Sequence, residues 1–416
     1  MKCYKSRWIL TSTGQVLENK ALVVDEGKFI DIIPNEDTTK FPEKVVKDLG
    51  NCVVTPGFID LFTQYQYTDI GTIKPHGFKN KLKKFFKTFS KNCIFAGVKR
   101  TSYSLKWANI LCDYFVLDRN DKIQSFKDGL YNAVKAGTTC IAQVSKEDKY
   151  FDIINRAPIK NYLFFEVYAD STEKSKHHFK KLRDRVENYI LHKGENTHIG
   201  IMLSSIPSVH KKLWELFSKY CRKHNMLLMT RFAESKDDIE WLEHGFSDID
   251  LLHKFMGLHK ITPYMKDTDP VTYLDELKVL TKKVIVANAN YVADEDLKRL
   301  ADTGVQYVYQ PEYSKEICNK RLDFETVLEH FKGNFGFSAQ SFNAKKEYSL
   351  LKIASKVNNG KLNAVELIKY LTIYPAKILR LEHVTGSIEI GKDADFTVFK
   401  LNEGEDFNAI LDKHYP

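Results

Sequence analysis

The sequence of 416 residues contains no long apolar segment and no regular cysteine pattern. No run approaches the roughly 20 apolar residues that span a bilayer, and the opening MKCYKSRWILTSTGQ lacks the apolar stretch of a secretory signal. The seven cysteines are scattered without a C-x-x-C pair, so neither a disulfide framework nor a zinc knuckle is indicated. We therefore expect a cytoplasmic protein with reduced, mostly buried thiols and no role at a membrane.

Short motifs in which histidine binds a catalytic metal are also absent. None of the 13 histidines forms an H-x-H or H-E-x-x-H pattern or is paired with a cysteine. His177 and His178 lie in the lysine-rich EKSKHHFKK, while His253 and His259 fall on a predicted helix. These four residues are expected on the surface or on a helix face rather than at a metal.

The net charge of +9 is modest for this length, and 43% of the residues are hydrophobic. Such a composition predicts a folded, globular chain with a large core. Charge of this size affects solubility and weak attraction to polyanions, and it gives no reason to expect nucleic acid as a partner.

Short apolar runs alternate with helical patterns through most of the chain. The first run starts at Val53, and the others are TTCIAQV, NYLFFEV, THIGIML, NMLLMTRF, KKVIVAN, VQYVYQ and GNFGFSA. Alternation of this kind favours parallel strands joined by crossover helices. The runs number eight, as in a (β/α)8 barrel, whose pocket lies at the carboxyl ends of the strands.

Strand patterns without helices stand at both ends of the chain. ALVVDEGKFIDIIP predicts two strands around a turn at Glu26-Gly27-Lys28, and GSIEIGKDADFTVFKL returns to strand. Just before it, NAVELIKYLTIYPAKIL has the periodicity of one amphipathic helix. We predict a small β-sandwich domain from residues 1–55 plus 385–416, and a barrel over 56–384.

The segments TPGFIDL and GSIEIGKDADFTVF resemble the opening and closing signatures of the amidohydrolase superfamily. The likeness covers nearly the whole chain. AES, EWLEHG and DEDLKRLA are most similar to the nucleoside-type deaminases and chlorohydrolases, especially aminofutalosine deaminase. The resemblance implies the same barrel and sandwich and a hydrolase of non-peptide C–N bonds.

Members of this family hold a divalent ion, and the resemblance assigns its ligands to five positions of this sequence. Those positions carry Phe62, Gln64, Arg231, Asn288 and Ser338, and a substrate-reading histidine is replaced by Ser204. Every expected ligand has changed, so the sequence predicts no metal and no other cofactor.

The replacements are poor ligands on chemical grounds. A phenyl ring offers no lone pair, amides are weak neutral donors, and a guanidinium cannot ligate. A dication about 4 Å from the Arg231 charge would be opposed by roughly 8 kcal/mol at an effective dielectric of about 20.

Glu234 matches the glutamate that moves protons in the related deaminases and is retained here. One interpretation is that Glu234 pairs with Arg231 and neutralises a buried charge, so that its catalytic role is vestigial. The alternative is that Arg231 binds an anionic ligand through both of its guanidinium N–H edges. His210, in the family-like SVH, either lines the pocket or opens a helix.

The segment from Lys79 to Lys91 alternates lysine with phenylalanine. The resemblance places a lid over the pocket there, and the pattern also permits a helix that binds a membrane surface or a polyanion. A solvated helix with Phe85, Phe86 and Phe89 packed inward is the third interpretation.

For function, the sequence favours a catalytically inactive binding or interaction homologue of the deaminases. Its expected partners are a small anionic or nucleoside-like ligand, a second copy, or an active paralogue. The alternative is a deaminase-like hydrolase of C–N bonds that is metal-independent or uses an unrecognised metal site.

Overall fold

A computed structural model describes residues 1–68, 88, 102–168, 172–255, 260–343 and 346–412. The lysine and phenylalanine segment 79–91 therefore lies outside the described residues apart from Thr88, as does His259. Within the described part, no helix combines the length and apolarity needed to cross a bilayer.

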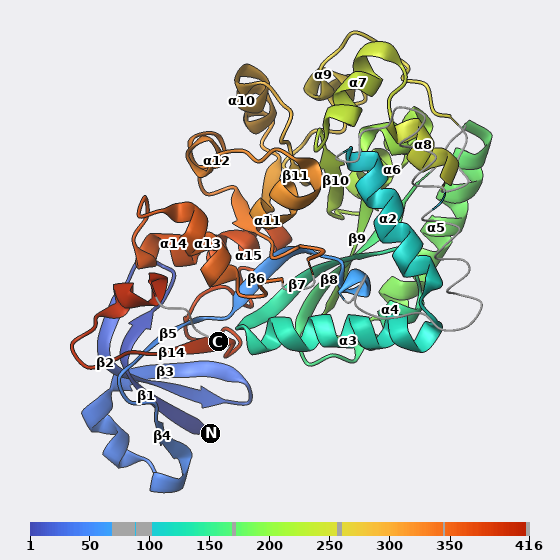
Figure 1. The fold of residues 1–416 in the computed structure, drawn as a ribbon. Coiled ribbons are helices and arrows are strands. Elements are labelled where there is room, and N and C mark those ends of the chain that lie inside the picture. Colours follow the sequence, from blue (N-terminus) through green and yellow to red (C-terminus); the bar gives the residue numbers. More distant parts are fainter. Residues whose placement is uncertain (69–87, 89–101, 169–171, 256–259, 344–345, 413–416) are drawn as a thin grey trace.

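Eight parallel strands form the larger sheet, in the sequence order expected for a barrel (Figure 1). They are β6 (Phe58–Thr63), β7 (Thr138–Ser145), β8 (Lys160–Val167), β9 (Thr197–Leu203), β10 (Leu228–Phe232), β11 (Val284–Asn288), β12 (Gln306–Tyr309) and β13 (Phe335–Phe337). The first and last strands are joined by side chains, since Ser338 Oγ donates to the Phe62 carbonyl at 2.5 Å and Asp60 Oδ2 accepts from the Ala339 amide at 3.1 Å. The predicted (β/α)8 architecture is confirmed.

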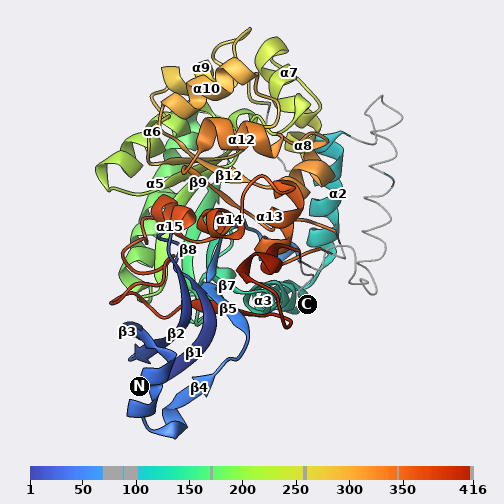
Figure 2. The ribbon, with the colours of Figure 1, turned by 90° about the vertical axis from the view of Figure 1, so that its left-hand side faces the viewer.

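Helices surround these strands, on the outside and over the mouth of the barrel (Figures 1 and 2). They are α2 (Tyr103–Val116), α3 (Arg119–Lys135), α4 (Lys149–Asn155), α5 (Thr172–His192), α6 (Lys211–Lys223), α7 (Lys236–His244), α8 (Ile249–Phe255), α9 (Pro270–Glu276), α10 (Asp294–Asp302), α11 (Pro311–Tyr313), α12 (Phe324–Phe331), α13 (Leu350–Asn358), α14 (Ala364–Leu371) and α15 (Ile373–Leu379). Short 3₁₀ turns lie at Tyr65–Tyr67 (η3) and Ile206–Ser208 (η4), and a π turn lies at Ser314–Cys318 (η5).

Both chain ends contribute to a second sheet of six strands (Figure 1). Its members are β1 (Lys2–Leu10), β2 (Val16–Asp25), β3 (Lys28–Pro34), β4 (Val46–Asp48), β5 (Cys52–Pro56) and β14 (Phe396–Lys400). The remaining 3₁₀ turns, η1 (Asn35–Lys40), η2 (Glu43–Val45) and η6 (Phe407–Leu411), also lie near the ends of the sequence. β14 runs antiparallel to β5, which joins the C-terminal strand to the N-terminal ones. The composite origin of this sheet agrees with the prediction, while the exact domain boundaries remain a prediction.

The apolar run that starts at Val53 is two strands rather than one. β5 belongs to the composite sheet and β6 to the barrel, with Gly57 between them. A Cβ on Gly57 would lie 2.0 Å from Thr139 Oγ1, so the chain passes from one sheet to the other at a point too close for a side chain. The expected helix NAVELIKYLTIYPAKIL is likewise two helices, because Pro375 cannot donate to the carbonyl of Leu371 and the chain breaks at Thr372.

The described cysteines agree with the expectation of buried, reduced thiols. Six of them are buried and form no disulfide: Cys3, Cys52, Cys112, Cys140, Cys221 and Cys318.

Candidate functional site

Alternation along the strands decides which side chains enter the barrel. In β10, Met229 belongs to the apolar cluster inside the barrel, whereas Leu228 and Phe232 pack outside against the helices. Arg231 has the same parity as Met229 and therefore points inward. By the same rule, Glu166 of β8 points inward, because it has the same parity as the inward residues Tyr162 and Phe164.

Arg231 is buried at the centre of the site and is held on every side. Its Nη1 donates to Glu166 Oε1 at 2.6 Å and to Ser204 Oγ at 3.1 Å, and its Nη2 donates to Gln64 Oε1 at 3.2 Å. The guanidinium carbon also lies 5.6 Å from the ring centroid of Phe62 and 5.2 Å from that of Trp107. Cation–π contacts of this kind add to the ion pair, so the side chain is fixed in one position.

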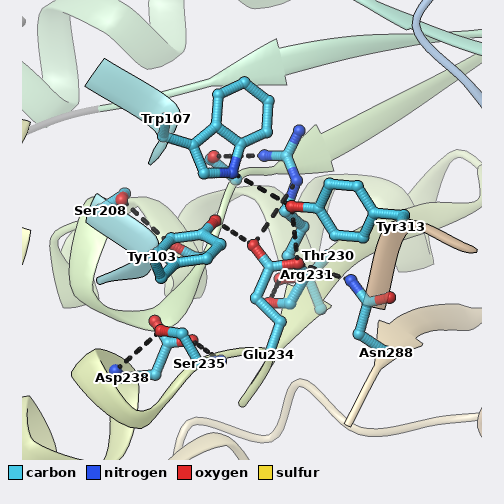
Figure 3. Close-up of polar contacts among 12 residues, drawn as sticks. Tyr103, Trp107, Ser208, Thr230, Arg231, Glu234, Ser235, Asp238, Asn288 and Tyr313 are labelled. Atoms are coloured by element: carbon cyan, nitrogen blue, oxygen red, sulfur yellow. Dashed lines mark hydrogen bonds and ion pairs between the residues drawn. The ribbon is translucent and has the colours of Figure 1, made fainter. Parts of the chain in front are cut away.

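Glu234 lies beside this guanidinium and is fully buried. Its Oε1 is 3.8 Å from Arg231 Nε and accepts a hydrogen bond from the Tyr103 hydroxyl. Its Oε2 accepts from Asn288 Nδ2 at 2.5 Å and from the Tyr313 hydroxyl at 3.4 Å (Figure 3). The predicted pairing of Arg231 with Glu234 is present, but Glu166 is the closer partner of the guanidinium.

The remaining predicted positions lie around the same centre. The Gln64 side chain accepts from Arg231, and its backbone N–H donates to Gln340 Oε1 at 3.0 Å. Asn288 leaves the strand with a φ of +80°, which turns its amide toward Glu234. Ser338 is the exception, because its hydroxyl is used at the seam between β13 and β6 rather than beside the guanidinium.

Aromatic side chains fill the mouth of the barrel over these polar groups. Tyr103 and Trp107 come from α2, and Tyr313 comes from α11. The Trp107 indole N–H donates to the Tyr313 hydroxyl at 3.1 Å (Figure 3). Beside them, a cavity of about 30 Å³ is lined by Tyr103, Trp107, Leu111, Tyr168, Ser204, Ser205, Ser208, Arg231 and Ile249. That space accommodates about two water molecules or a group of similar size.

A much larger groove, of about 850 Å³, lies elsewhere, between η5, α13 and the C-terminal segment. None of the seven predicted site residues lines it. Two of its carboxylates pair with neighbouring lysines: Glu312 with Lys356 at 3.0 Å and Glu347 with Lys352 at 3.5 Å. This groove has the larger volume, but the buried ionisable residues Arg231, Glu166 and Glu234 lie inside the barrel. We therefore place the candidate site in the barrel.

Burial and neighbouring charges shift the ionisation of the site. Burial raises the pKa of Glu234, although Arg231 and the hydrogen bonds from Tyr103 and Asn288 act in the opposite direction. Burial alone would lower the pKa of Arg231, but Glu166 above all raises it well above its usual range. Burial, and then the charge of Glu234, raise the pKa of the Tyr103 hydroxyl. The guanidinium is therefore a permanent cation, and Tyr103 is a hydrogen-bond donor.

The residues at this centre do not fit the divalent ion that the family resemblance implies. A phenyl ring, two amides, a hydroxyl and a guanidinium stand at the ligand positions, and the guanidinium is a fixed positive charge. Among the described residues, no group of three or more His, Cys, Asp or Glu side chains is arranged to hold a metal. The retained Glu234 carboxylate instead meets hydrogen-bond donors and Arg231.

Several residues of the site were not recognised from the sequence, among them Glu166 and His253. Glu166 was missed, although a lone acid in the buried run NYLFFEV, with the parity of Tyr162 and Phe164, marks an inward charge. His253 was expected on a helix face; it is on α8 but is 1% exposed and contacts Ser208. His210 caps the start of α6, where its Nδ1 accepts from the Lys212 amide at 3.2 Å, and it is not among the residues lining the cavity.

Comparison with known proteins agrees with this architecture. The model of the amidohydrolase family matches residues 53–414. An aminodeoxyfutalosine deaminase from a Nitratiruptor species is 23% identical over 412 residues, which cover 97% of this chain and 92% of that protein. A 5-methylthioadenosine/S-adenosylhomocysteine deaminase from Caldicellulosiruptor saccharolyticus is 22% identical over 416 residues, covering 96% and 84%.

Solved structures show the same fold. The crystal structure of Helicobacter pylori aminofutalosine deaminase in complex with methylthio-coformycin superposes with a TM-score of 0.78 at 18% identity, covering 99% of this chain and 95% of that one. An adenosine deaminase from Xanthomonas campestris with bound zinc has a TM-score of 0.71 at 12% identity, covering 98% and 88%. With the family model matched over most of its length, the chain belongs to the amidohydrolase family.

Proposed function

We propose that this chain is an amidohydrolase-fold protein that has lost metal-dependent hydrolysis and acts through binding or interaction. One observation carries the proposal: the Arg231 guanidinium stands at a position assigned to a metal ligand and is immobilised by Glu166 at 2.6 Å. A dication at that centre would meet a fixed positive charge that has no room to withdraw.

The neighbouring residues support the same proposal because they complement the guanidinium. Glu166 neutralises Arg231, Gln64 accepts from its second nitrogen, and Phe62 packs against its face. A guanidinium introduced without these partners would be a costly buried charge. Such mutual compensation is expected of a centre selected for stability rather than for a metal-bound water.

Charge and space bear on the kind of partner. Two carboxylates, Glu166 and Glu234, surround one guanidinium, which disfavours an anionic ligand inside the barrel. A cavity of about 30 Å³ is also far below the roughly 300–1,000 Å³ of a typical small-molecule site. A second copy or an active paralogue that uses the outer surface is therefore the partner we favour over a nucleoside-like ligand.

Metal analysis combined with activity assays tests the loss of hydrolysis. Protein expressed with added zinc or iron is purified, its metal content is measured by mass spectrometry, and ammonia release is followed with adenosine and 5-methylthioadenosine. We expect substoichiometric metal and no turnover. Stoichiometric zinc or iron together with ammonia release would refute the proposal. Light scattering, alone and after co-expression with an active deaminase, tests the interaction.

A second candidate is a metal-free hydrolase that uses Glu234. The observation in its favour is that burial raises the pKa of Glu234 above its usual value, which is the direction that acid–base catalysis by a carboxyl group requires. Glu234→Gln keeps the shape and the contact with Asn288 while removing the titration. If any C–N hydrolysis is detected in the wild type, its loss in this variant supports the candidate, whereas an unchanged rate rejects it.

A further inference from the structure

A chain of hydrogen bonds runs along one wall of the small cavity. Ser205 Oγ donates to Ser208 Oγ at 2.8 Å, and Ser208 Oγ lies 3.0 Å from His253 Nε2. Ser205 lies two residues after the end of β9 and immediately before the turn η4, Ser208 ends η4, and His253 belongs to α8. The three residues are 7%, 6% and 1% exposed, so water competes little for these bonds.

The order of the chain gives it a direction. Ser205 and Ser208 both line the cavity, while His253 is not among the lining residues and lies behind Ser208. Because Ser205 is the donor to Ser208, a proton that leaves Ser205 has a path through Ser208 to the imidazole. With its own proton on Nδ1, His253 accepts at Nε2, which makes it the terminal base.

We propose that Ser205 is a nucleophile that takes up small acyl groups through this Ser205–Ser208–His253 relay. Ser205 Oγ forms a bond to the carbonyl carbon of an ester; its proton passes to Ser208 Oγ, and the Ser208 proton passes to His253 Nε2. The tetrahedral intermediate expels the alcohol, which takes the proton back from His253 through Ser208 and leaves an acyl-serine. Water then attacks the acyl carbon while its proton passes through Ser208 to His253, and that proton returns to Ser205 Oγ as the acid leaves.

The cavity also determines the substrate class. Arg231 lines the same space, but its Nη1 and Nη2 already donate to Glu166, Ser204 and Gln64, so the ester must be activated enough to react without a charged donor to its oxyanion. A volume of about 30 Å³ admits an acetyl or carbamoyl group at most. The substrate is therefore a small, activated ester of acetic or carbamic acid, and larger acyl groups are excluded.

This inference goes beyond the proposed loss of metal-dependent hydrolysis and does not depend on it. The relay contains none of the positions assigned to metal ligands. Its readout is a covalent modification of one serine, whereas the proposed function is tested by metal content and ammonia release. Either proposal can therefore be refuted while the other stands.

Acetylation by 4-nitrophenyl acetate tests the relay in the full-length protein. Nitrophenolate release is followed in real time, and the acetylated residue is identified by peptide mass spectrometry. We expect a burst of nitrophenolate and an acetyl group on Ser205. Ser208→Ala and His253→Gln should each slow the acetylation of Ser205 by about 100-fold, the usual contribution of a positioned base. 4-Nitrophenyl decanoate should give no burst.

Matched variants separate the relay from a general effect on folding. Ser218→Ala removes a buried serine of α6 that does not line the cavity, and it should acetylate at the wild-type rate. If Ser205→Ala does not fold by circular dichroism, Ser205→Cys replaces it, and a thioester at residue 205 is then expected. Absence of acetylation at residue 205 in the folded wild type, or an unchanged rate in both Ser208→Ala and His253→Gln, would overturn the proposal.

Discussion

The composite sheet and the barrel mouth differ in how far they agree with the family motifs named above. The sheet retains the opening and closing segments of the family, and its C-terminal strand β14 still pairs with β5 in register. In the barrel mouth, each assigned ligand position carries a different chemical type, and aromatic rings from α2 and α11 cover the centre. Apolar alternation and backbone pairing maintain the fold whatever the central polar side chains are, so architecture and chemistry change independently.

The two regions also differ in what their charges do. In the mouth, Arg231 and Glu166 are each about 4% exposed and depend on one another. At the sheet, Lys160 of β8 contacts Asp393 and Asp395 near the surface of the domain junction. Loss of the Arg231–Glu166 pair should lower the stability of the whole fold strongly. Loss of the Lys160 contacts should weaken only the attachment of the sheet to the barrel.

The largest effect should come from Arg231→Met. This change leaves Glu166 and Glu234 buried without their cation, and we expect a loss of about 3–5 kcal/mol in the free energy of unfolding. Urea denaturation measures it. Arg231→Met combined with Glu166→Gln should recover part of the loss, because the uncompensated charge is then removed.

A matched surface variant gives the control. Arg183 pairs with Asp184 at 2.6 Å, but these side chains are 37% and 52% exposed. Arg183→Met should change the free energy of unfolding by less than about 1 kcal/mol. Equal losses in Arg183→Met and Arg231→Met would contradict the central role of the buried pair.

The pH dependence of stability tests the barrel seam through Asp60. Burial raises the pKa of Asp60 to about 7, although the amides of Phe62 and Ala339 lower it. Since an unfolded aspartate titrates near pH 4, the folded chain binds the extra proton between about pH 4 and pH 7. The contribution of Asp60 is therefore fully present below about pH 4 and declines as the pH rises to about 7.

Asp60→Asn should remove that slope, because an amide does not titrate. The difference between wild type and variant in the free energy of unfolding should change by on the order of 1.4 kcal/mol per pH unit across this window. Asparagine also turns an N–H₂ toward one backbone amide, which costs about 1–3 kcal/mol at every pH. A parallel pH dependence in the two proteins would show that Asp60 does not titrate in this range.

A smaller effect is expected where the sheet meets the barrel. Lys160 is 11% exposed and pairs with both Asp393 and Asp395, whereas Lys28 is 53% exposed and pairs with Asp393. Lys160→Met should lower the free energy of unfolding by about 1–3 kcal/mol, and Lys28→Met by less than about 1 kcal/mol. If thermal melts show the two variants to be equally stable, the junction does not depend on Lys160.

The smallest effect concerns a helix cap beside the site. His210→Ala removes the acceptor for the Lys212 amide and should cost about 0.5–1 kcal/mol, while His210→Asn, which retains an acceptor, should cost less. Acetylation of Ser205 should be unchanged in both variants. A large change in that rate would instead favour the interpretation that His210 lines the pocket.

The sequence predicted the architecture well because apolar runs and turn signals are local. The Glu26-Gly27-Lys28 turn and the alternating strands are examples. The failures occurred where local patterns are ambiguous. Both sides of Gly57 are apolar, so two strands resembled one, and the helical periodicity on both sides of Thr372 concealed the break before Pro375.

The site was predictable only in part. Family motifs indicated Arg231, Glu234 and Asn288, which the structure brings together. The contribution of Glu166 needed the strand parity, and that of Tyr103 and Trp107 needed tertiary packing, because no local pattern places α2 over the barrel mouth. The fit between Arg231 and its partners Glu166 and Gln64 is recognised only from the structure, because these residues are distant in sequence.

The Trp107 indole provides an intrinsic optical reporter of this centre. Its N–H is bonded to Tyr313, and its ring lies against the Arg231 guanidinium. Fluorescence from this ring should respond to rearrangement of the barrel mouth. Because Trp214 and Trp241 are fully buried elsewhere in the core, replacing Trp107 by phenylalanine would isolate its emission by difference.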